Sequence, residues 1–483
     1  MDRRAFLRRV VGGVAACALS RAPLGLGAPE RPNVLLITAD DMNWDSLGVT
    51  GCKIPGISPN LDKLASQGMR FAHAHVTVAV CMPCREVLMT GRYTWRCGAV
   101  GFHPIRPDVP TLQEQLDRAG YMQGILGKVP HLAPQRKFCW DTVVGANELD
   151  AGRSPQLYYQ HAKAFIEKAK AAGKPFFLMA NSHDPHRPFV GSQQERGKFR
   201  RRIQNGKPLP KASRVYKPEE IEVPGFLPDI PDVRKEVAQY FGSAHRSDET
   251  AGAVLRALEE TGLADNTLVM FLSDHGMAFP FAKTNCYLNS TRTPWIVRWP
   301  GKVKPGTVDR EHFISGIDFM PTILDATGVA PPQGMDGRSF LPLLLGGKQE
   351  GRGFVYTVFD QTAGRKNYPM RCLQTHRLGY IFNPWSDGRT VFRNESQSGL
   401  SMKAMRKAAE TDKAIAARVQ LFLYRVREEL YDFEKDPDGL HNLADDPKHR
   451  AELDRMRKAM LAHMARIGDP QLPALKKQIG MKG

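Results

Sequence analysis

The segment from Cys81 to Arg92 (CMPCREVLMTGR) is the part of the chain with the clearest potential for chemistry. Cys81 and Cys84 are separated by two residues, a spacing that is found in thiol redox pairs and in one half of a zinc ribbon. A zinc ribbon needs a second close pair of ligands, whereas the other cysteines are scattered singly (17, 52, 97, 139, 286, 372). A redox pair normally belongs to a much shorter domain. Neither interpretation therefore explains the segment well.

Two adjacent carboxylates follow the first strongly apolar segment. Residues 34–37 are four successive apolar residues between a proline and a polar turn, which is typical of a parallel strand buried on both faces. Asp40 and Asp41 come at the carboxyl end of this predicted strand, where ligands gather in open α/β sheets. The pair indicates a cation site, with a helix N-cap or a solvated turn as the alternative.

Three further predicted strands, at 121–126, 176–180 and 267–272, also lead into polar residues. These residues are Lys128 and His131 after the first strand, His183 after the second, and Asp274 and His275 after the third. Taken alone, a single lysine or histidine is more often a solvated surface group, and Asp274-His275 is as consistent with a structural turn as with a ligand pair. Their placement at several strand ends makes them candidates for one common site.

The arrangement as a whole resembles the sulfatase family. Residues 81–92 match the family's maturation motif of cysteine, proline and arginine followed by Thr-Gly-Arg, with Cys84 where the commonest members carry serine. Residues 58–68 (SPNLDKLASQG) and 429–444 resemble two further sulfatase segments, so that the resemblance covers nearly the whole chain after the N-terminus. It implies that Cys81 is oxidised after translation to formylglycine, an aldehyde whose hydrate is the nucleophile.

The resemblance also implies a metal site. Its expected ligands are Asp40, Asp41, Cys81, Asp274 and His275. Hard oxygen ligands favour calcium or magnesium over a soft transition metal. Sulfatases of this type usually hold one calcium ion, so we expect Ca²⁺, with Mg²⁺ as the alternative.

Six residues receive catalytic roles by the same resemblance: Cys81, Arg85, Lys128, His131, His183 and Lys283. Arg85 and Lys128 hold the formylglycine hydrate, whereas His183 and Lys283 contact the sulfate and the leaving atom. His131 is the base that collapses the covalent sulfate intermediate. Cationic groups suit these roles because sulfate transfer leaves negative charge on the sulfate oxygens and on the leaving atom.

Several stretches resemble the sulfamidases, which act on N-sulfoglucosamine, more than the arylsulfatases. They are residues 175–189, the spacing from Asp274 to Lys283, and residues 368–371. The stretch 127–131 resembles iduronate 2-sulfatases instead. We therefore expect a sulfatase of sulfated glycans, first a heparan-type sulfamidase and second an O-sulfatase. The alternatives are a phosphonate or phosphodiester hydrolase of the same superfamily and a non-catalytic protein that binds sulfated glycans.

These residues need an α/β fold that brings several strand ends together. The resemblance implies an alkaline-phosphatase-like catalytic domain at 30–348, with a large central mixed sheet flanked by helices. Beyond it, short candidate strands at 354–359, 370–374 and 378–382 indicate a small antiparallel sheet. We expect these strands and helices at about 401–426 and 447–467 to form a smaller α+β subdomain at 349–483.

Residues 1–28 resemble a twin-arginine signal peptide. Arg3 and Arg4 precede an apolar run at 10–19, and small residues surround Ala28. We expect a periplasmic or secreted protein, which is bound to a membrane only if Cys17 is lipidated.

The charge of the chain narrows the expected partners. Its formal net charge of +18 favours polyanions, but no nucleic-acid-binding motif is present. A sulfated carbohydrate substrate and the enzyme that converts Cys81 to formylglycine are therefore the expected partners, and nucleic acid is not.

Overall fold

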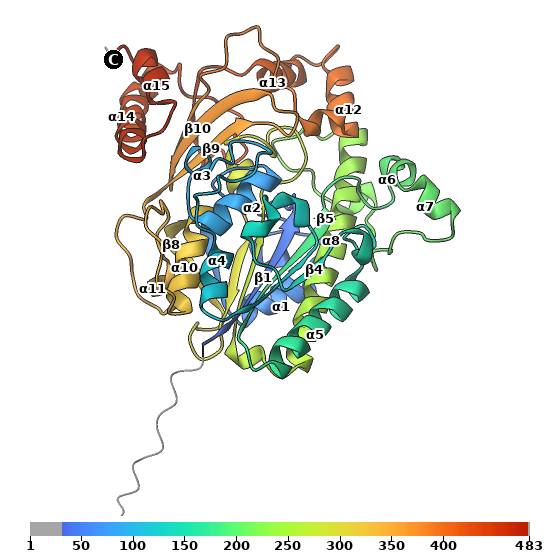
Figure 1. Ribbon diagram of the computed structural model, residues 1–483. Helices are drawn as coiled ribbons and strands as arrows, with labels where there is room; N and C mark the ends of the chain where they lie inside the picture. Colours follow the sequence, from blue (N-terminus) through green and yellow to red (C-terminus); the bar gives the residue numbers. More distant parts are fainter. Residues whose placement is uncertain (1–30, 482–483) are drawn as a thin grey trace, which may run out of the picture. The chain divides into compact units, whose positions relative to one another are not determined.

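An eight-stranded mixed sheet forms the centre of the computed structural model, which describes residues 31–481 (Figure 1). Its order is β4-β3-β5-β1-β6-β7-β2-β8. The first five strands are mutually parallel, whereas β7 runs antiparallel to both β6 and β2. The strands are β1 (Asn33–Asp40), β2 (Met69–His75), β3 (Met122–Leu126), β4 (Thr142–Val144), β5 (Phe176–Pro185), β6 (Thr267–Ser273), β7 (Trp295–Arg298) and β8 (Thr307–Ser315).

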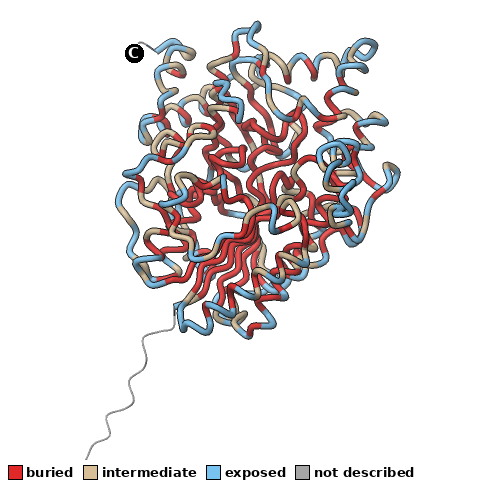
Figure 2. The backbone as a smooth tube through the Cα atoms, turned by 45° about the vertical axis from the view of Figure 1, so that its right-hand side comes forward, coloured by how far each residue is buried: buried red, intermediate tan, exposed pale blue. Residues whose placement is uncertain are grey.

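Helices cover both faces of this sheet. Side chains of β1 alternate between the faces, as in any extended strand: Leu35 and Ile37 belong to one apolar cluster, Val34 and Leu36 to the other. The first cluster lies under α1 (Pro59–Ser66), α5 (Pro155–Ala171) and α8 (Pro231–Glu260), and the second under α2 (Cys81–Thr90), α4 (Leu112–Arg118) and α10 (Phe319–Ala326). Figure 2 shows the sheet as the buried centre of the chain. This double cover explains why β1 is apolar along its whole length.

A second, four-stranded antiparallel sheet follows in the chain, in the order β12-β11-β10-β9. Its strands are β9 (Phe354–Gln361), β10 (Asn367–Thr375), β11 (Leu378–Phe382) and β12 (Glu428–Asp432). A bridge between Val78 and Val358 joins this sheet to the segment that precedes α2. The α/β fold with a large mixed sheet and a smaller antiparallel one is confirmed. From Pro32 onward the chain forms one compact unit, and the domain boundary at 348/349 stays a prediction.

The C-terminal helices differ from the expected pattern. The single helix expected at 401–426 consists of α12 (Leu400–Ala408) and α13 (Lys413–Tyr424). The break occurs because Asp412 begins α13 as its N-cap, where its side chain accepts hydrogen bonds from the backbone N–H groups of Ala414 and Ile415. The last helices are α14 (Arg450–Ile467) and α15 (Leu472–Gln478). The remaining short helices are α3 (Thr94–Cys97), α6 (Gln193–Lys198), α7 (Arg200–Gln204), α9 (Leu288–Thr291) and α11 (Leu341–Leu344).

The expected signal peptide at 1–28, including Cys17, lies outside the described residues. Within residues 31–481, no helix has the length and apolar character that a membrane crossing requires.

Candidate active site

The ends of β1 and β6 place three carboxylates side by side. The two strands are parallel neighbours with Ala39 opposite Ser273, so Asp40 and Asp274 leave the sheet at the same edge. Asp41 follows in a left-handed backbone conformation (φ 67°), and its N–H donates to Asp274 Oδ1 at 3.1 Å. All three side chains are fully buried. This is the strand-end cluster that the sequence predicts.

Arg85 ties these carboxylates to α2. Cys81 is the first residue of that helix, and Arg85 lies about one turn further along it. Its Nη2 is 2.8 Å from Asp274 Oδ2 and 3.6 Å from Asp40 Oδ1. Its Nη1 donates to Thr38 Oγ1 at 2.9 Å and to Asn181 Oδ1 at 2.6 Å. Burial alone would lower the pKa of Arg85, but Asp274 and Asp40 outweigh it and keep the guanidinium charged.

Each of the two N-terminal aspartates also has its own lysine. Lys128, at the end of β3, forms an ion pair with Asp40, and Lys283 Nζ is 2.9 Å from Asp41 Oδ2. Burial would raise the pKa of Asp40, yet Lys128, His186 and Arg85 together hold it well below its usual range. For Asp41 burial prevails and raises the pKa to about 7. The structure thus brings the predicted lysines and aspartates into one site.

His275 completes a set of ligand atoms that suits a cation. Its Nδ1 lies 2.9 Å from the carbonyl oxygen of Gly276, so that this nitrogen carries the proton and Nε2 keeps its lone pair. Nε2 lies 3.3 Å from Cys81 Sγ, 3.3 Å from Asp41 Oδ1 and 3.7 Å from Asp274 Oδ1. Asp41 Oδ1 has no hydrogen-bond partner among the described residues. Several buried lone pairs therefore converge where a positive charge would stabilise them.

The donor set fits a hard divalent cation. One ligand atom each from Asp40, Cys81, Asp274 and His275 lies within 4.8 Å of the others. Two of these four atoms are carboxylate oxygens, the ligands that calcium and magnesium prefer. Conversion of Cys81 to formylglycine would replace its sulfur by oxygen and make the set harder still.

Cys81 opens onto a cavity of about 600 Å³. We call five of its lining residues, Cys81, Lys128, His131, His186 and Lys283, the floor. We call the other lining residues the rim: Val80, Phe102, Thr284, residues 362–364 and Lys366 between β9 and β10, and residues 393–395. Both sheets of the fold therefore contribute residues to one cavity.

The three histidines near this cavity have different surroundings. His131 lines it, and burial, Lys128 and Arg85 hold its pKa well below the usual range, so the imidazole is neutral and can accept a proton. His183 instead faces the backbone, because its Nε2 accepts a hydrogen bond from the N–H of Lys128 at 3.2 Å, and it does not line the cavity. His186, three residues further on, does line it. Its Nε2 is 3.4 Å from Glu395 Oε1 and 3.9 Å from Asp41 Oδ2.

Sequence reasoning missed four residues of this site: Thr38, Asn181, His186 and Glu395. His186 belongs to the same HDPH segment as His183. The sequence indicates the segment, but it does not indicate which of the two histidines lines the cavity. Thr38 and Asn181 lie beside predicted strand ends, but an uncharged side chain alone does not indicate a role in an active site. Glu395 follows no motif, yet its Oε2 is 2.8 Å from Lys283 Nζ.

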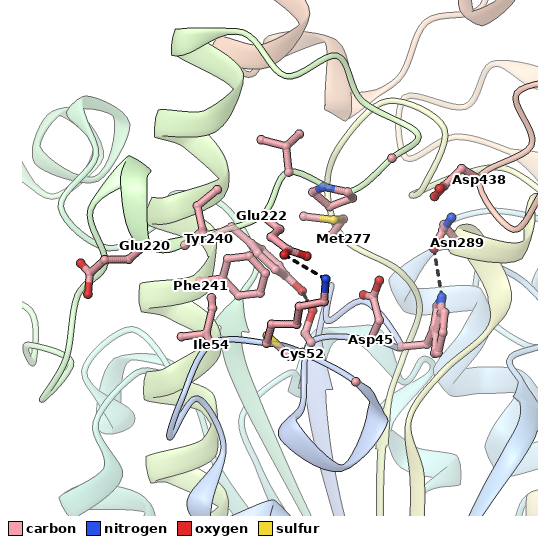
Figure 3. Close-up of a pocket in the computed structure, with 18 of the residues that line it drawn as sticks. Asp45, Cys52, Ile54, Glu220, Glu222, Tyr240, Phe241, Met277, Asn289 and Asp438 are labelled. Carbon is pink, nitrogen blue, oxygen red and sulfur yellow. Dashed lines mark hydrogen bonds and ion pairs between the residues drawn. The ribbon is translucent and has the colours of Figure 1, made fainter.

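A second cavity, of about 480 Å³ (Figure 3), shares no lining residue with the cavity of Cys81. Lys53 and Glu222 form an ion pair there at 3.0 Å, next to Cys52, Tyr240 and Asp438. Burial raises the pKa of the Cys52 thiol to about 11, which leaves it a weak nucleophile at neutral pH. Burial raises the pKa of the Cys81 thiol as well, so the cavity of Cys81 is distinguished by the buried lysines and carboxylates beside it and not by thiol reactivity.

Comparison with known proteins agrees with this geometry. The model of the sulfatase family matches residues 32–329. Human N-sulphoglucosamine sulphohydrolase is 30% identical over 488 residues, which cover 95% of this chain and 94% of that protein. An ulvan-active sulfatase of Formosa agariphila is 27% identical over 449 residues, 91% of this chain and 81% of that protein. The chain belongs to the sulfatase family and is an enzyme that hydrolyses sulfate esters or sulfamates.

Solved structures support the same fold. A protein solved in complex with its substrate D-glucosamine-2-N,6-O-disulfate superposes with a TM-score of 0.68 at 17% identity, over 91% of this chain and 99% of that one. This chain therefore shares its overall fold with that protein.

Proposed function

We propose that this sulfatase hydrolyses the N-sulfate of N-sulfoglucosamine units in sulfated glycans of the heparan type. The observation that carries the proposal is the end-to-end similarity to human N-sulphoglucosamine sulphohydrolase, at 30% identity with 94% of that protein covered. The cavity supports it, because lysines and histidines line it together with Cys81 and its volume of about 600 Å³ is that of a ligand pocket.

The proposal includes formylglycine at position 81 and one calcium ion. Asp40, Asp41, Asp274 and His275, with residue 81, would hold the cation, which would polarise an oxygen of the hydrate and neutralise charge on the sulfate. The hydrate would supply an oxygen nucleophile that thiol and serine side chains cannot replace, because a geminal diol can expel sulfate and return to the aldehyde.

The residues of the chain itself bind, orient and move protons. Lys128 and Lys283 present two positive charges to the sulfate at the cavity floor, and Arg85 fixes the carboxylates of Asp40 and Asp274 beneath it. His131, neutral and with Nδ1 unpartnered among the described residues, takes the hydroxyl proton of the hydrate when sulfate leaves. Lys283, together with His186 beside it, faces the leaving nitrogen.

Export and maturation belong to the same proposal. Passage through the twin-arginine route as a folded protein would allow a cytoplasmic maturation enzyme to convert Cys81 first, and the enzyme would then act in the periplasm or outside the cell.

Release of sulfate from two sulfated glucosamine derivatives tests which substrate the enzyme uses. N-sulfoglucosamine and 6-O-sulfated N-acetylglucosamine carry the same sulfate group on nitrogen and on oxygen. We expect release from the first only, and a Cys81→Ala variant, which has no residue to mature, as the inactive control. Release from the second sugar only would refute the sulfamidase assignment and leave the sulfatase reaction intact.

An O-sulfatase of a related glycan is the second candidate. It is favoured by the similarity to the ulvan-active sulfatase. A matched phosphate ester in the same assay would reveal phosphoryl transfer, the remaining hydrolytic alternative.

A further inference from the structure

Two positive side chains on the rim of the active-site cavity have no protein partner. Lys366 belongs to the loop between β9 and β10, and Arg393 to the segment that precedes residues 395–398. Both line the cavity of Cys81, and both residues are exposed. Within residues 31–481, neither side chain forms a hydrogen bond or an ion pair. By contrast, the cations at the floor, Lys128 and Lys283, are each paired with a carboxylate.

The backbone holds both residues in defined places. In the loop, Thr362 N–H donates to the carbonyl of Lys366 at 3.0 Å, and Lys366 N–H donates to Thr362 Oγ1 at 3.2 Å. Arg393 stands between two anchored neighbours. Phe392 is fully buried, and Asn394 Nδ2 donates to Thr284 Oγ1 at 2.5 Å. The two charges are therefore presented by fixed segments and not by a loose chain.

Glu395 does not neutralise these charges. Its Oε2 is 2.8 Å from Lys283 Nζ and its Oε1 is 3.4 Å from His186 Nε2, so both oxygens face the floor of the cavity. Among the described residues, this carboxylate therefore pairs with neither Lys366 nor Arg393. If the reacting sulfate lies beside Cys81, the two charges of the rim are left for another anion.

We propose that Lys366 and Arg393 form a second anion subsite, which binds a second sulfate or a carboxylate of the same saccharide. The inference rests on the proposed function, since it requires a glycan whose first sulfate lies at Cys81. An unpaired guanidinium matches the oxygens of either anion with two parallel hydrogen bonds, and a lysine adds a point charge. A neutral neighbouring sugar would leave both charges without a partner.

Turnover of three N-sulfated saccharides by the mature enzyme tests this subsite. They are N-sulfoglucosamine, its 6-O-sulfated form, and N-sulfoglucosamine linked to a uronic acid. The variants Lys366→Gln and Arg393→Gln should lower kcat/KM at least about fivefold for a saccharide that has the second anion, and leave N-sulfoglucosamine itself unchanged. The control Lys458→Gln removes an exposed charge on α14 and should change none of the three.

The pattern of losses identifies the second anion and separates this inference from the proposed function. A loss confined to the 6-O-sulfated sugar assigns the subsite to a sulfate, and a loss confined to the uronate disaccharide assigns it to a carboxylate. Equal losses on all three saccharides, or no loss on either doubly charged one, would overturn the subsite. If the wild-type enzyme releases sulfate from none of them, the proposed function fails. Calorimetric binding of the same saccharides to wild-type and variant proteins then decides the subsite by the same comparison.

Discussion

At the scale of single residues, the site depends on charges that are buried together and balanced against one another. Asp40 lies between Lys128 and Arg85, and Asp41 lies beside Lys283. Removal of one partner would leave the other charge buried and uncompensated, which costs about 3–5 kcal/mol in comparable cases. The composition of this cluster was predictable from motifs. The choice of histidine was not, because it depends on how the side chain of His183, inside β5, and that of His186, just beyond it, are directed by the fold.

The two histidines of the HDPH segment should have separable effects. We expect His186→Gln to lower kcat/KM for sulfate release by about a hundredfold, because this imidazole lines the cavity beside Lys283. His183→Gln should act mainly on stability, because His183 accepts the N–H of Lys128 from outside the cavity. Steady-state kinetics and thermal unfolding of both variants measure the difference. A larger loss of kcat/KM in His183→Gln than in His186→Gln would contradict the assignment of His186 to the active site.

Glu86 provides a pH-dependent test one residue beyond Arg85. It is fully buried, its Oε1 accepts only the N–H of Ala133 at 3.2 Å, and burial raises its pKa from the ordinary 4.5 to about 9. Between these values the folded protein holds a proton that the unfolded chain has released, so this residue's contribution to stability is lost as the pH rises. Glu86→Gln should therefore stabilise the protein by about 1–3 kcal/mol at pH 8 and by little at pH 4.

Urea unfolding of wild type and Glu86→Gln across this pH range measures the effect. Glu167→Gln, an exposed substitution on α5, is the matched control. A difference between Glu86→Gln and wild type that does not change with pH would refute the account of Glu86.

At the scale of elements, the residues of the site lie at the ends of strands of the large sheet. The long helix α8 contacts the segments at the ends of β1 and β5, through Tyr240 to Asn43 and through Arg246 to Asp184. Continuous apolar runs predicted β1, β3, β5 and β6, since each of these strands is buried on both faces of the sheet. The apolar patterns did not predict helix ends that a capping residue sets. Asp412, the N-cap of α13, divides the helix expected at 401–426 into two. The patterns also missed that Cys81 begins a helix, because all ten residues of α2 are buried and no exposed face marks its period.

Asp248 of α8 gives a prediction at this scale. Its Oδ1 accepts the N–H of Leu61 at 2.8 Å and its Oδ2 that of Asn60 at 3.2 Å, so it caps the first turn of α1 from a different helix. Asp248→Ala should lower the free energy of unfolding by about 1–2 kcal/mol, as the loss of an N-cap does. Denaturant titration measures this, with Lys235→Ala, an exposed substitution on α8, as the control. An unchanged midpoint in Asp248→Ala would contradict the capping role.

At the scale of the whole molecule, the two sheets meet at one cavity. The large sheet supplies the carboxylates and the residues of the floor, and the smaller sheet supplies Lys366 at the rim. The resemblance implied the large sheet, whereas the short candidate strands at 354–359, 370–374 and 378–382 predicted the smaller one. Their meeting at the cavity could not be predicted, because residues 362–366 and 393–395 carry no motif and owe their position to tertiary contacts.

A bound cation should stabilise the whole fold. Asp41 and Asp274 both have pKa values raised to about 7 by burial, so a divalent cation would bind the folded protein and displace protons that those carboxylates otherwise hold. Chelation should lower the midpoint of thermal unfolding, and calcium should restore it. At a free calcium concentration one hundred times Kd, the cation should add about 2.7 kcal/mol to the free energy of unfolding. An Asp41→Asn variant should lose most of this response. Equal responses in wild type and variant would place the cation elsewhere.

The most direct test of the central claim is the mass of the peptide that contains residue 81, measured on protein that releases sulfate. The account predicts that Cys81 is replaced by formylglycine, with an oxygen in place of sulfur and two hydrogens fewer, and that activity rises in proportion to the converted fraction. Full activity in protein whose Cys81 is an intact thiol would contradict it.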